Sequence, residues 1–195
     1  HCFGLLLALT KKIHSNAIEV SSGAWKSGWK KPVGNEIMGK TIGIIGLGRI
    51  GKEVATRAKA FGMKIIAYDP YFDDEFGKEY DVEKGSTMDE VLCNCDIVSL
   101  HCFLNEETHG MINSKKIEQM RDNVIVINCA RGEIVDTNDM NSGLVSGKVG
   151  GYGTDVLDTE PPEENHPLIN APNCIIPLRS LISSLDHFNF KKLFA

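Results

Sequence analysis

Short runs of apolar, largely β-branched residues recur along the chain and alternate with segments whose apolar positions follow helical spacing. Continuous apolar runs of this length are typical of strands buried on both faces of a parallel sheet. They lie at Thr41 to Ile45, Lys64 to Tyr68, Asp96 to His101, Asn123 to Asn128, Gly150 to Val156 and, more briefly, Cys174 to Ile176. Strands that alternate with helices predict an α/β fold, a Rossmann-type doubly wound parallel sheet in a single domain.

The segments between the runs carry helix signals. The clearest helix begins at Ile50, where Ile50, Val54, Ala58 and Phe61 share one face and Gly62 follows as a C-cap. Other starts are Thr87 in a TxxE capping box, Asn113 or Ser114 before a helix through Met120, and Thr137 or Asn138 before a helix that ends near Gly147.

The N-terminal residues 1–13 predict an amphipathic helix. Two stretches are predicted to be connections. The first, His14 to Lys40, is a long loop with Trp25 and Trp29 as packing anchors. Pro70 to Gly85 is strongly charged and predicts a further loop.

The first apolar run leads directly into a glycine turn, Gly46-Leu47-Gly48-Arg49-Ile50-Gly51. In a GxGxxG the first glycine permits the turn, the second lets a pyrophosphate approach the backbone, and the third lets helix and strand pack closely. The helix that follows presents free N–H groups and a positive dipole end to a phosphate. A bare glycine-rich turn of another α/β protein is the alternative, but strand, turn and helix occur here in the required order.

The second strand ends on Asp69, about where the acidic partner of an adenosine ribose is expected. Its carboxylate can accept hydrogen bonds from ribose hydroxyls and would repel a 2′-phosphate, which favours NAD over NADP. An aspartate in a turn before Pro70 is the alternative.

Composition narrows the class of protein. The 195 residues carry a net charge of −5, which gives no electrostatic footprint for nucleic acid, and no apolar run is long enough to span a membrane. The six cysteines include no CxxC pair and predict free thiols rather than a disulfide framework or a zinc site. We therefore expect no metal and a cytoplasmic location.

Polar residues follow the later strands. Arg131 comes shortly after Asn123 to Asn128, Asp155 lies at the end of the next strand, and Asp158 and Glu160 follow it. Because ligands of a doubly wound sheet collect at the carboxyl ends of its strands, these side chains are candidates for a substrate site. A surface arginine and a loop glutamate before a proline are the alternatives.

The segments GLGRIG, YDP at Tyr68 to Pro70, NCARGEIVD and GTDVLDTEPP together make the chain similar to the D-isomer-specific 2-hydroxyacid dehydrogenases, from His1 to about Pro177. Within that family the motifs look closest to the phosphoglycerate dehydrogenases. The resemblance implies hydride transfer between NAD and a small 2-hydroxy or 2-oxo acid, which includes 3-phosphoglycerate, and a homodimer formed through the NAD-binding domain.

The resemblance also implies roles for particular residues. Arg131 would clamp the substrate carboxylate and border the cofactor, and Glu160 would orient the catalytic histidine and raise its pKa. Asp155 would hold the nicotinamide amide. Backbone groups of Arg49 and Ile50 would contact the pyrophosphate, and Cys102, Cys129 and Ala130 match positions that border the cofactor.

The chain departs from the family at two places. Phe103 stands where a proline is usual, and Leu178 stands where the family has the histidine of a PHxG motif. The tail 178–195 resembles nothing in the family, although Leu181, Leu185 and Phe188 predict one helical face. His187 and His101 are the candidates for a replacement base, whereas His14, His109 and His166 fall in predicted loops as solvated residues.

Two hypotheses follow. In the first, residues 1–177 are the NAD-binding domain of a dehydrogenase whose substrate domain lies mainly before His1 and partly after Pro177. In the second, the chain is a non-catalytic NAD-binding module with a sensing or scaffold role. They share the fold and differ at Leu178, where the nucleotide sequence on both sides of the reading frame would discriminate a fragment from a splice variant or an incomplete gene.

Overall fold

The computed structural model describes residues 1–23 and 33–177. Within them a seven-stranded sheet runs in the order β3-β2-β1-β4-β5-β6-β7, and every neighbouring pair is parallel. This confirms the predicted Rossmann-type doubly wound sheet. The strands are β1 (Thr41–Ile45), β2 (Lys64–Tyr68), β3 (Val82–Lys84), β4 (Ile97–Leu100), β5 (Val124–Asn128), β6 (Val149–Thr154) and β7 (Cys174–Ile175).

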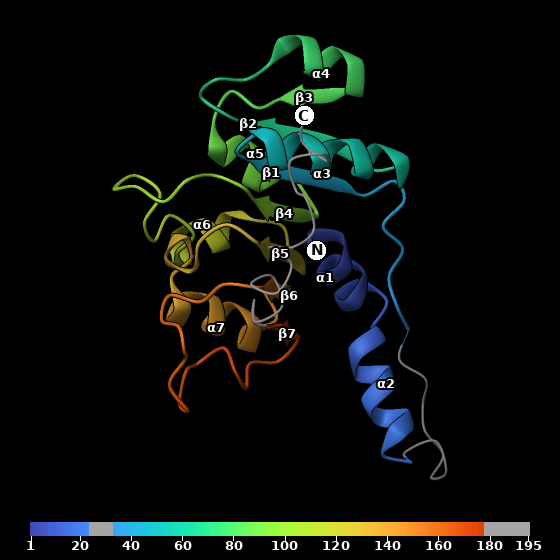
Figure 1. Cartoon of the computed structure of the whole chain (residues 1–195), viewed down its shortest axis with the longest axis vertical. Coiled ribbons are helices and arrows are strands. Elements are labelled where there is room, and N and C mark those ends of the chain that lie inside the picture. The colour runs from blue at the N-terminus through green and yellow to red at the C-terminus, as the bar shows by residue number, and fades with distance from the viewer. Residues whose placement is uncertain (24–32, 178–195) are drawn as a thin grey trace, which may run out of the picture.

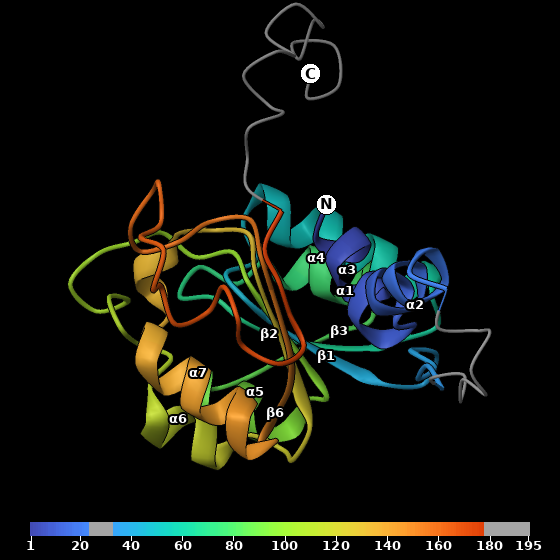
Figure 2. The same ribbon diagram turned by 90° about the horizontal axis from the view of Figure 1, so that it is seen from below.

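Helices cover both faces of the sheet (Figures 1 and 2). On one face α1 (Cys2–Thr10) and α3 (Arg49–Ala60) pack through Leu5, Leu6 and Val54. On the other, α5 (Met88–Asn94), α6 (Ser114–Gln119) and α7 (Thr137–Ser146) pack through residues that include Val91, Ile117 and Met140. Two apolar cores therefore sandwich the sheet.

Side-chain caps fix the helix starts on this frame. Thr87 and Asn113 accept hydrogen bonds from the N–H groups of Glu90 and Lys116, as the sequence predicted, and Asp136 caps α7 through Asn138 and Asp139. Because an N-cap oxygen satisfies an N–H that the helix leaves without a partner, these residues set where each helix begins. The 3₁₀ turn η2 (Gly132–Ile134) lies between β5 and α7.

The N-terminal prediction was wrong in one respect. The first helix ends at Thr10, and a second helix, α2 (Ile13–Ser21), occupies the start of the stretch predicted as a loop. Lys12 adopts a left-handed conformation with φ 54°, which breaks the helix between the two. Helix α2 buries none of its residues, although Ile13, Ala17 and Val20 recur at helical spacing. Trp25 and Trp29 lie outside the described residues.

The prediction of a charged loop from Pro70 to Gly85 was also wrong. It contains α4 (Asp74–Tyr80), capped by Asp73, and the short edge strand β3 beside β2. The predicted helical face of α3 was correct at Val54 and Ala58, but Ile50 is 64% and Phe61 is 42% exposed. Ile50 lies in the first turn of α3, next to the carboxyl edge of the sheet, where no core residue covers it. The tail 178–195, with Leu178, Leu181, Leu185, His187 and Phe188, lies outside the described residues.

Candidate functional site

The predicted site residues gather at one edge of the sheet. Each follows the carboxyl end of a parallel strand: the glycine turn follows β1, Asp69 follows β2, Cys102 follows β4, Cys129 to Arg131 follow β5, and Asp155 and Glu160 follow β6. Parallel strands bring these ends together, so one edge presents the glycine turn, Asp69 and the later loops side by side.

The glycine turn joins β1 to α3 in close backbone contact. Gly46 has φ 96°, and a Cβ built on it would lie 2.7 Å from the backbone N of Cys102. A Cβ on Gly51 would lie 2.1 Å from the carbonyl oxygen of Gly46. The first and third glycines therefore fit the predicted structural roles, because any side chain would collide with backbone there.

Gly48 differs from its neighbours. It is the N-cap of α3 with φ −71° and ψ −163°, angles that any L-residue adopts, and a Cβ on it would meet no heavy atom within 4 Å. The glycine is therefore not needed for the fold of this chain alone. The open space in front of it, at the N-terminus of a 12-residue helix, fits a phosphate that has to approach the backbone.

Asp69 is tied to the same turn. Its Oδ2 accepts a hydrogen bond of 2.7 Å from the backbone N–H of Leu47, and its Oδ1 accepts one of 2.7 Å from that of Tyr71. A carboxylate oxygen has a second lone pair, so both oxygens retain acceptor capacity for ribose hydroxyls. The carboxylate is thus held in a fixed position next to the glycine turn.

The loop after β5 is held by a residue that the sequence analysis missed. Asn128, the fully buried last residue of β5, donates from Nδ2 to the Arg131 carbonyl at 2.8 Å and accepts at Oδ1 from the Ala130 N–H at 3.0 Å. Arg131 is exposed, and its Nη1 donates to the carbonyl of Ala130 at 2.7 Å. An asparagine that ends an otherwise apolar run was a visible signal of this role.

Asp155 follows β6 and is 4% exposed. Its Oδ2 lies 3.8 Å from Nε2 of His1, at the start of α1, a neighbour that the sequence did not indicate. Thr154, just before it, bonds from Oγ1 to the carbonyl of Asn128 at 2.9 Å. The ends of β5 and β6 are therefore locked to one another at this edge.

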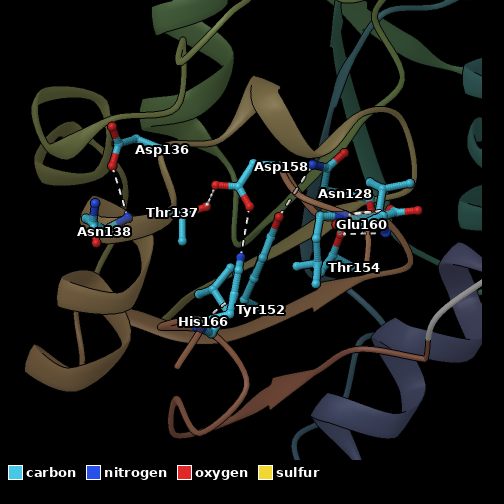
Figure 3. A network of polar contacts seen from close by, with 12 residues as sticks. Asn128, Asp136, Thr137, Asn138, Tyr152, Thr154, Asp158, Glu160 and His166 are labelled. Atoms are coloured by element: carbon cyan, nitrogen blue, oxygen red, sulfur yellow. Dashed lines mark hydrogen bonds and ion pairs between the residues drawn. The ribbon is translucent and has the colours of Figure 1, made fainter. Parts of the chain in front are cut away.

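Glu160 lies in the exposed loop after β6, where its Oε1 accepts a 2.9 Å hydrogen bond from the Leu157 N–H. Beside it, Asp158 accepts from Thr137 Oγ1 at 2.7 Å and pairs with Nε2 of His166 at 2.8 Å (Figure 3). Partial burial raises the pKa of Asp158, but the hydrogen bonds from His166 and Thr137 outweigh it and hold the pKa below the ordinary value.

The prediction that His166 is solvated was wrong. It is 8% exposed, its Nδ1 accepts a 3.3 Å bond from the Leu168 N–H, and its Nε2 therefore donates to Asp158. Both ring nitrogens are occupied, so His166 clamps the loop after β6 and has no free nitrogen for proton transfer. His109 is exposed in its loop as expected, whereas His14 lies in α2.

Gly132 brings the loops after β5 and β6 into contact. A Cβ on Gly132 would lie 2.0 Å from the carbonyl carbon of Leu157 and 2.3 Å from the backbone N of Asp158. Arg131 therefore leaves its strand directly against the segment that leads to Glu160. No comparable contact is seen between either residue and Asp69, which lies across β1 and β4 in the sheet order.

His101, a candidate base, is part of the interior. Its Nε2 lies 2.7 Å from Ser99 Oγ, which in turn lies 3.2 Å from the buried Cys2 Sγ. Burial lowers the pKa of His101 to about 4 and raises that of the adjacent Cys102 thiol to about 11. Both side chains are therefore uncharged near neutral pH, so His101 adds no positive charge to the carboxyl edge of the sheet.

This burial predicts a pH effect on stability. The unfolded chain, with His101 near pKa 6.5, binds more protons than the folded chain between about pH 4 and 6.5. Stability is thus fully present above pH 6.5 and falls as the pH drops through this window, by up to about 3 kcal/mol from this group. Urea unfolding at pH 7 and pH 4.5 should show a smaller pH difference in His101→Gln than in the parent chain. The exposed His109→Gln is the matched control, and an equal pH difference in all three chains would contradict the interpretation.

Within residues 1–23 and 33–177, no group of three or more His, Cys, Asp or Glu side chains is placed to hold a metal ion, and no helix is long and apolar enough to cross a membrane. All six cysteines are free thiols. A cavity of about 790 Å³ lies at the opposite edge of the sheet and is lined by Lys12, Asn123 and Asn173 among others. It contains none of the predicted site residues.

Comparison with known proteins points to one family. The family described as D-isomer specific 2-hydroxyacid dehydrogenase, NAD binding domain, matches residues 3–177. D-3-phosphoglycerate dehydrogenase of Bacillus subtilis (strain 168) is 41% identical over 175 residues, 88% of this chain and 33% of that protein. Glyoxylate reductase of Korarchaeum cryptofilum is 37% identical over 176 residues, 89% of this chain and 53% of that protein.

Solved structures agree in fold. A formate dehydrogenase of Granulicella M. superimposes with a TM-score of 0.87 and 28% identity over 92% of this chain and 48% of its own. A glyoxylate reductase from Paecilomyes thermophila superimposes with a TM-score of 0.81 and 34% identity, over 91% of this chain and 52% of its own. The chain thus spans about a third to half the length of these proteins.

Proposed function

Because this chain belongs to the D-isomer specific 2-hydroxyacid dehydrogenases, a family of NAD-dependent oxidoreductases, and matches their NAD binding domain, we propose that residues 1–177 bind NAD at the carboxyl edge of the sheet. The observation that carries this proposal is the open space at Gly48, beside a carboxylate fixed at Asp69. The proposed activity is hydride transfer between NAD and a small 2-hydroxy or 2-oxo acid, of which 3-phosphoglycerate is one candidate.

Each part of the edge has a role in this proposal. The backbone of Gly46, Gly48, Arg49, Ile50 and Gly51 would hold the pyrophosphate at the start of α3, and Asp69 would accept from the ribose hydroxyls. The neutral Cys102, Cys129 with Ala130, and the carboxylate of Asp155 would border the remainder of the dinucleotide, with Asp155 on the nicotinamide amide. The restrained backbones of these segments support a preformed site.

When bound, NAD would accept the hydride. The chain's contribution is to bind and orient the acid. The exposed guanidinium of Arg131 offers a planar fork that suits a carboxylate, and the loop that carries it is fixed by Asn128. Glu160, held by the Leu157 N–H, would orient a histidine base and favour its protonated form. The contact at Gly132 sets the spacing of these two loops.

The role of Asp69 is testable through cofactor choice. Asp69→Ala should weaken NAD binding by about tenfold to a hundredfold, since a hydrogen bond to a charged group contributes ~1.5–3 kcal/mol. It also removes the acceptors of the Leu47 and Tyr71 N–H groups, so Asp69→Asn, which retains one acceptor oxygen, separates the ribose effect from the loss of turn geometry. Titration calorimetry should show that both variants narrow the preference for NAD over NADP. A preference that does not change would contradict the assignment.

We further propose that this chain alone does not complete the reaction. Leu178 stands in the sequence where the family has its histidine and has no proton to exchange, whereas a positioned acid–base typically contributes 10²–10⁴-fold. Leu178 also favours the second candidate function, a non-catalytic NAD-binding module. Both candidate functions, an incomplete dehydrogenase and a non-catalytic module, predict that the chain binds NAD. Both also predict that it does not turn over phosphohydroxypyruvate, hydroxypyruvate, glyoxylate or pyruvate. Turnover by this chain would show that another residue supplies the proton.

We also propose a cytoplasmic homodimer. Helix α2 projects from the body of the molecule and leaves Ile13 55%, Ile18 54% and Val20 48% exposed (Figure 1). Exposed apolar residues on an element that buries none of its own side chains are typical of an interface. Ile13→Asp with Val20→Asp should lower the mass in sedimentation equilibrium from dimer to monomer, whereas Val145→Asp on α7, where the side chain is 68% exposed, should not.

A further inference from the structure

The proposed function leaves unused the cavity at the amino edge of the sheet, where the strands begin and which lies opposite the glycine turn. The cavity holds about 790 Å³ and lies beside the first residues of β4, β5 and β6. Its lining includes the buried apolar side chains of Leu9, Ile97 and Val149. A volume of this size is typical of sites for small molecules.

The charges around the cavity are unevenly balanced. Each carboxylate that lines it is already paired with a cation. The pairs are Glu36 with Lys11 at 2.8 Å, Asp122 with Lys148 at 2.7 Å, and Asp96 with Arg121 at 3.4 Å. Because Lys12 and Lys40 also line the cavity, five cations face three carboxylates here, in a chain whose net charge is −5. This local excess of positive charge favours an anion.

The two lining lysines retain donors for such an anion. Lys12 Nζ donates to the neutral amide oxygen of Asn173 at 3.0 Å and forms an ion pair with no carboxylate among residues 1–23 and 33–177. Lys40 Nζ lies 3.8 Å from Asp96 Oδ1, which is too far for a hydrogen bond. An ammonium group carries three donors, so both lysines can bind a further acceptor.

Lys12 also has a backbone conformation that does not suit a lysine. Its φ of 54° and ψ of 34° lie in the left-handed region, which Asn123 and Asn173 share at the same cavity. Asparagine tolerates this region, whereas a long side chain adopts it rarely. Because unfavourable backbone conformations persist mainly at functional sites, a lysine at this position indicates a role for its ammonium group.

We propose that this cavity binds a small organic dianion whose two anionic groups are separate, as in a dicarboxylate. One group would lie at Lys12 and the other at Lys40, in charge-assisted hydrogen bonds. The side-chain amides of Asn35 and Asn123 line the same cavity, make no hydrogen bond within the described part of the chain, and would donate to the remaining oxygens. The occupant would link the junction of α1 and α2 to the segment that begins β1.

Succinate and its neutral analogue succinamide test the site in the full chain. Succinate should cause saturable amide shifts at Lys12, Lys40 and Asn123 of the ¹⁵N-labelled chain, and succinamide should cause none. Lys12→Asn should weaken succinate binding about tenfold to a hundredfold, as expected for loss of a hydrogen bond to a charged group. It should not lower the urea midpoint, because asparagine suits the left-handed backbone. Lys12→Arg should retain binding.

The matched control is Lys115→Asn, which removes the same charge from an exposed position on α6 and should leave succinate binding unchanged. A loss confined to Lys12→Asn, with an unchanged urea midpoint, supports the site. Equal affinity in Lys12→Asn and the parent chain, equal binding of succinamide, or no saturable shift at millimolar succinate would overturn it.

The location of the shifts decides between the anion site and its alternatives. Shifts at Gly46 and Gly48 would place succinate at the carboxyl edge and overturn the proposal. Shifts of the cavity amides on dilution of the chain without succinate would assign the cavity to contact with a second copy, and would also overturn it. None of these measurements contains NAD, so failure of the anion site leaves the proposed function standing.

Discussion

Gly48→Ala should lose NAD affinity by about tenfold to a hundredfold while the chain stays folded, and Gly48→Val should bind no detectable NAD. A Cβ at this position enters the space proposed for the pyrophosphate, and the cost of forcing extra atoms into an occupied site is typically ~1–3 kcal/mol. The fold should tolerate the change because the Gly48 angles suit an L-residue and no heavy atom lies within 4 Å of the new Cβ. Loss of a glycine N-cap should cost about 1 kcal/mol or less.

The other glycines of the turn provide the contrast. Gly46→Ala and Gly51→Ala place a Cβ against backbone and should lower the urea midpoint as well as the NAD affinity. Calorimetry paired with urea unfolding therefore separates a ligand clash from a folding defect. NAD affinity that is unaffected in folded Gly48→Val would place the dinucleotide elsewhere.

Gly132→Ala should cause the largest loss of stability. The new Cβ would lie within 2.3 Å of three backbone atoms of Leu157 and Asp158, which cannot move aside as a side chain can. We expect a loss of about 3 kcal/mol or more in the free energy of unfolding, which lowers the urea midpoint by about 1–3 M.

The control for this variant is Gly4→Ala in α1, where a Cβ meets nothing within 4 Å and the helix should gain about 0.5–1 kcal/mol. Equal midpoints for Gly132→Ala and the parent chain would show that the loops carrying Arg131 and Glu160 are not in contact in solution.

The sequence predicted the central strands and α3 because their signals are local. Buried parallel strands read as apolar runs, and the glycine turn marks where β1 ends and α3 begins. These elements also carry the candidate residues, so the carboxyl edge was predictable as a set of strand ends. The roles proposed for Arg131, Glu160 and Asp155 came from the family resemblance and remain predictions.

The elements that were missed lack such local signals. Helix α2 is only nine residues long and buries none of them, so its apolar positions were not recognised as a helix face, and β3 is a three-residue edge strand that is too short for a periodic pattern. The clamp of His166 on Asp158 depends on how the loop after β6 folds back, which residue spacing alone does not specify. Asn128 was recognisable only as a polar residue at the end of an apolar run, because its partners are backbone groups of the next loop.

The most direct test of the account is to map NAD on the chain by amide chemical shifts. A uniformly ¹⁵N-labelled chain titrated with NAD should show saturable shifts at Gly46, Gly48, Cys102 and Ala130, at the carboxyl edge of the sheet. The amides of Lys12, Asn123 and Asn173, which line the cavity at the opposite edge, should stay unchanged. Saturable shifts confined to that cavity, or no shifts at millimolar NAD, would contradict the central claim that the glycine turn and Asp69 form the NAD site.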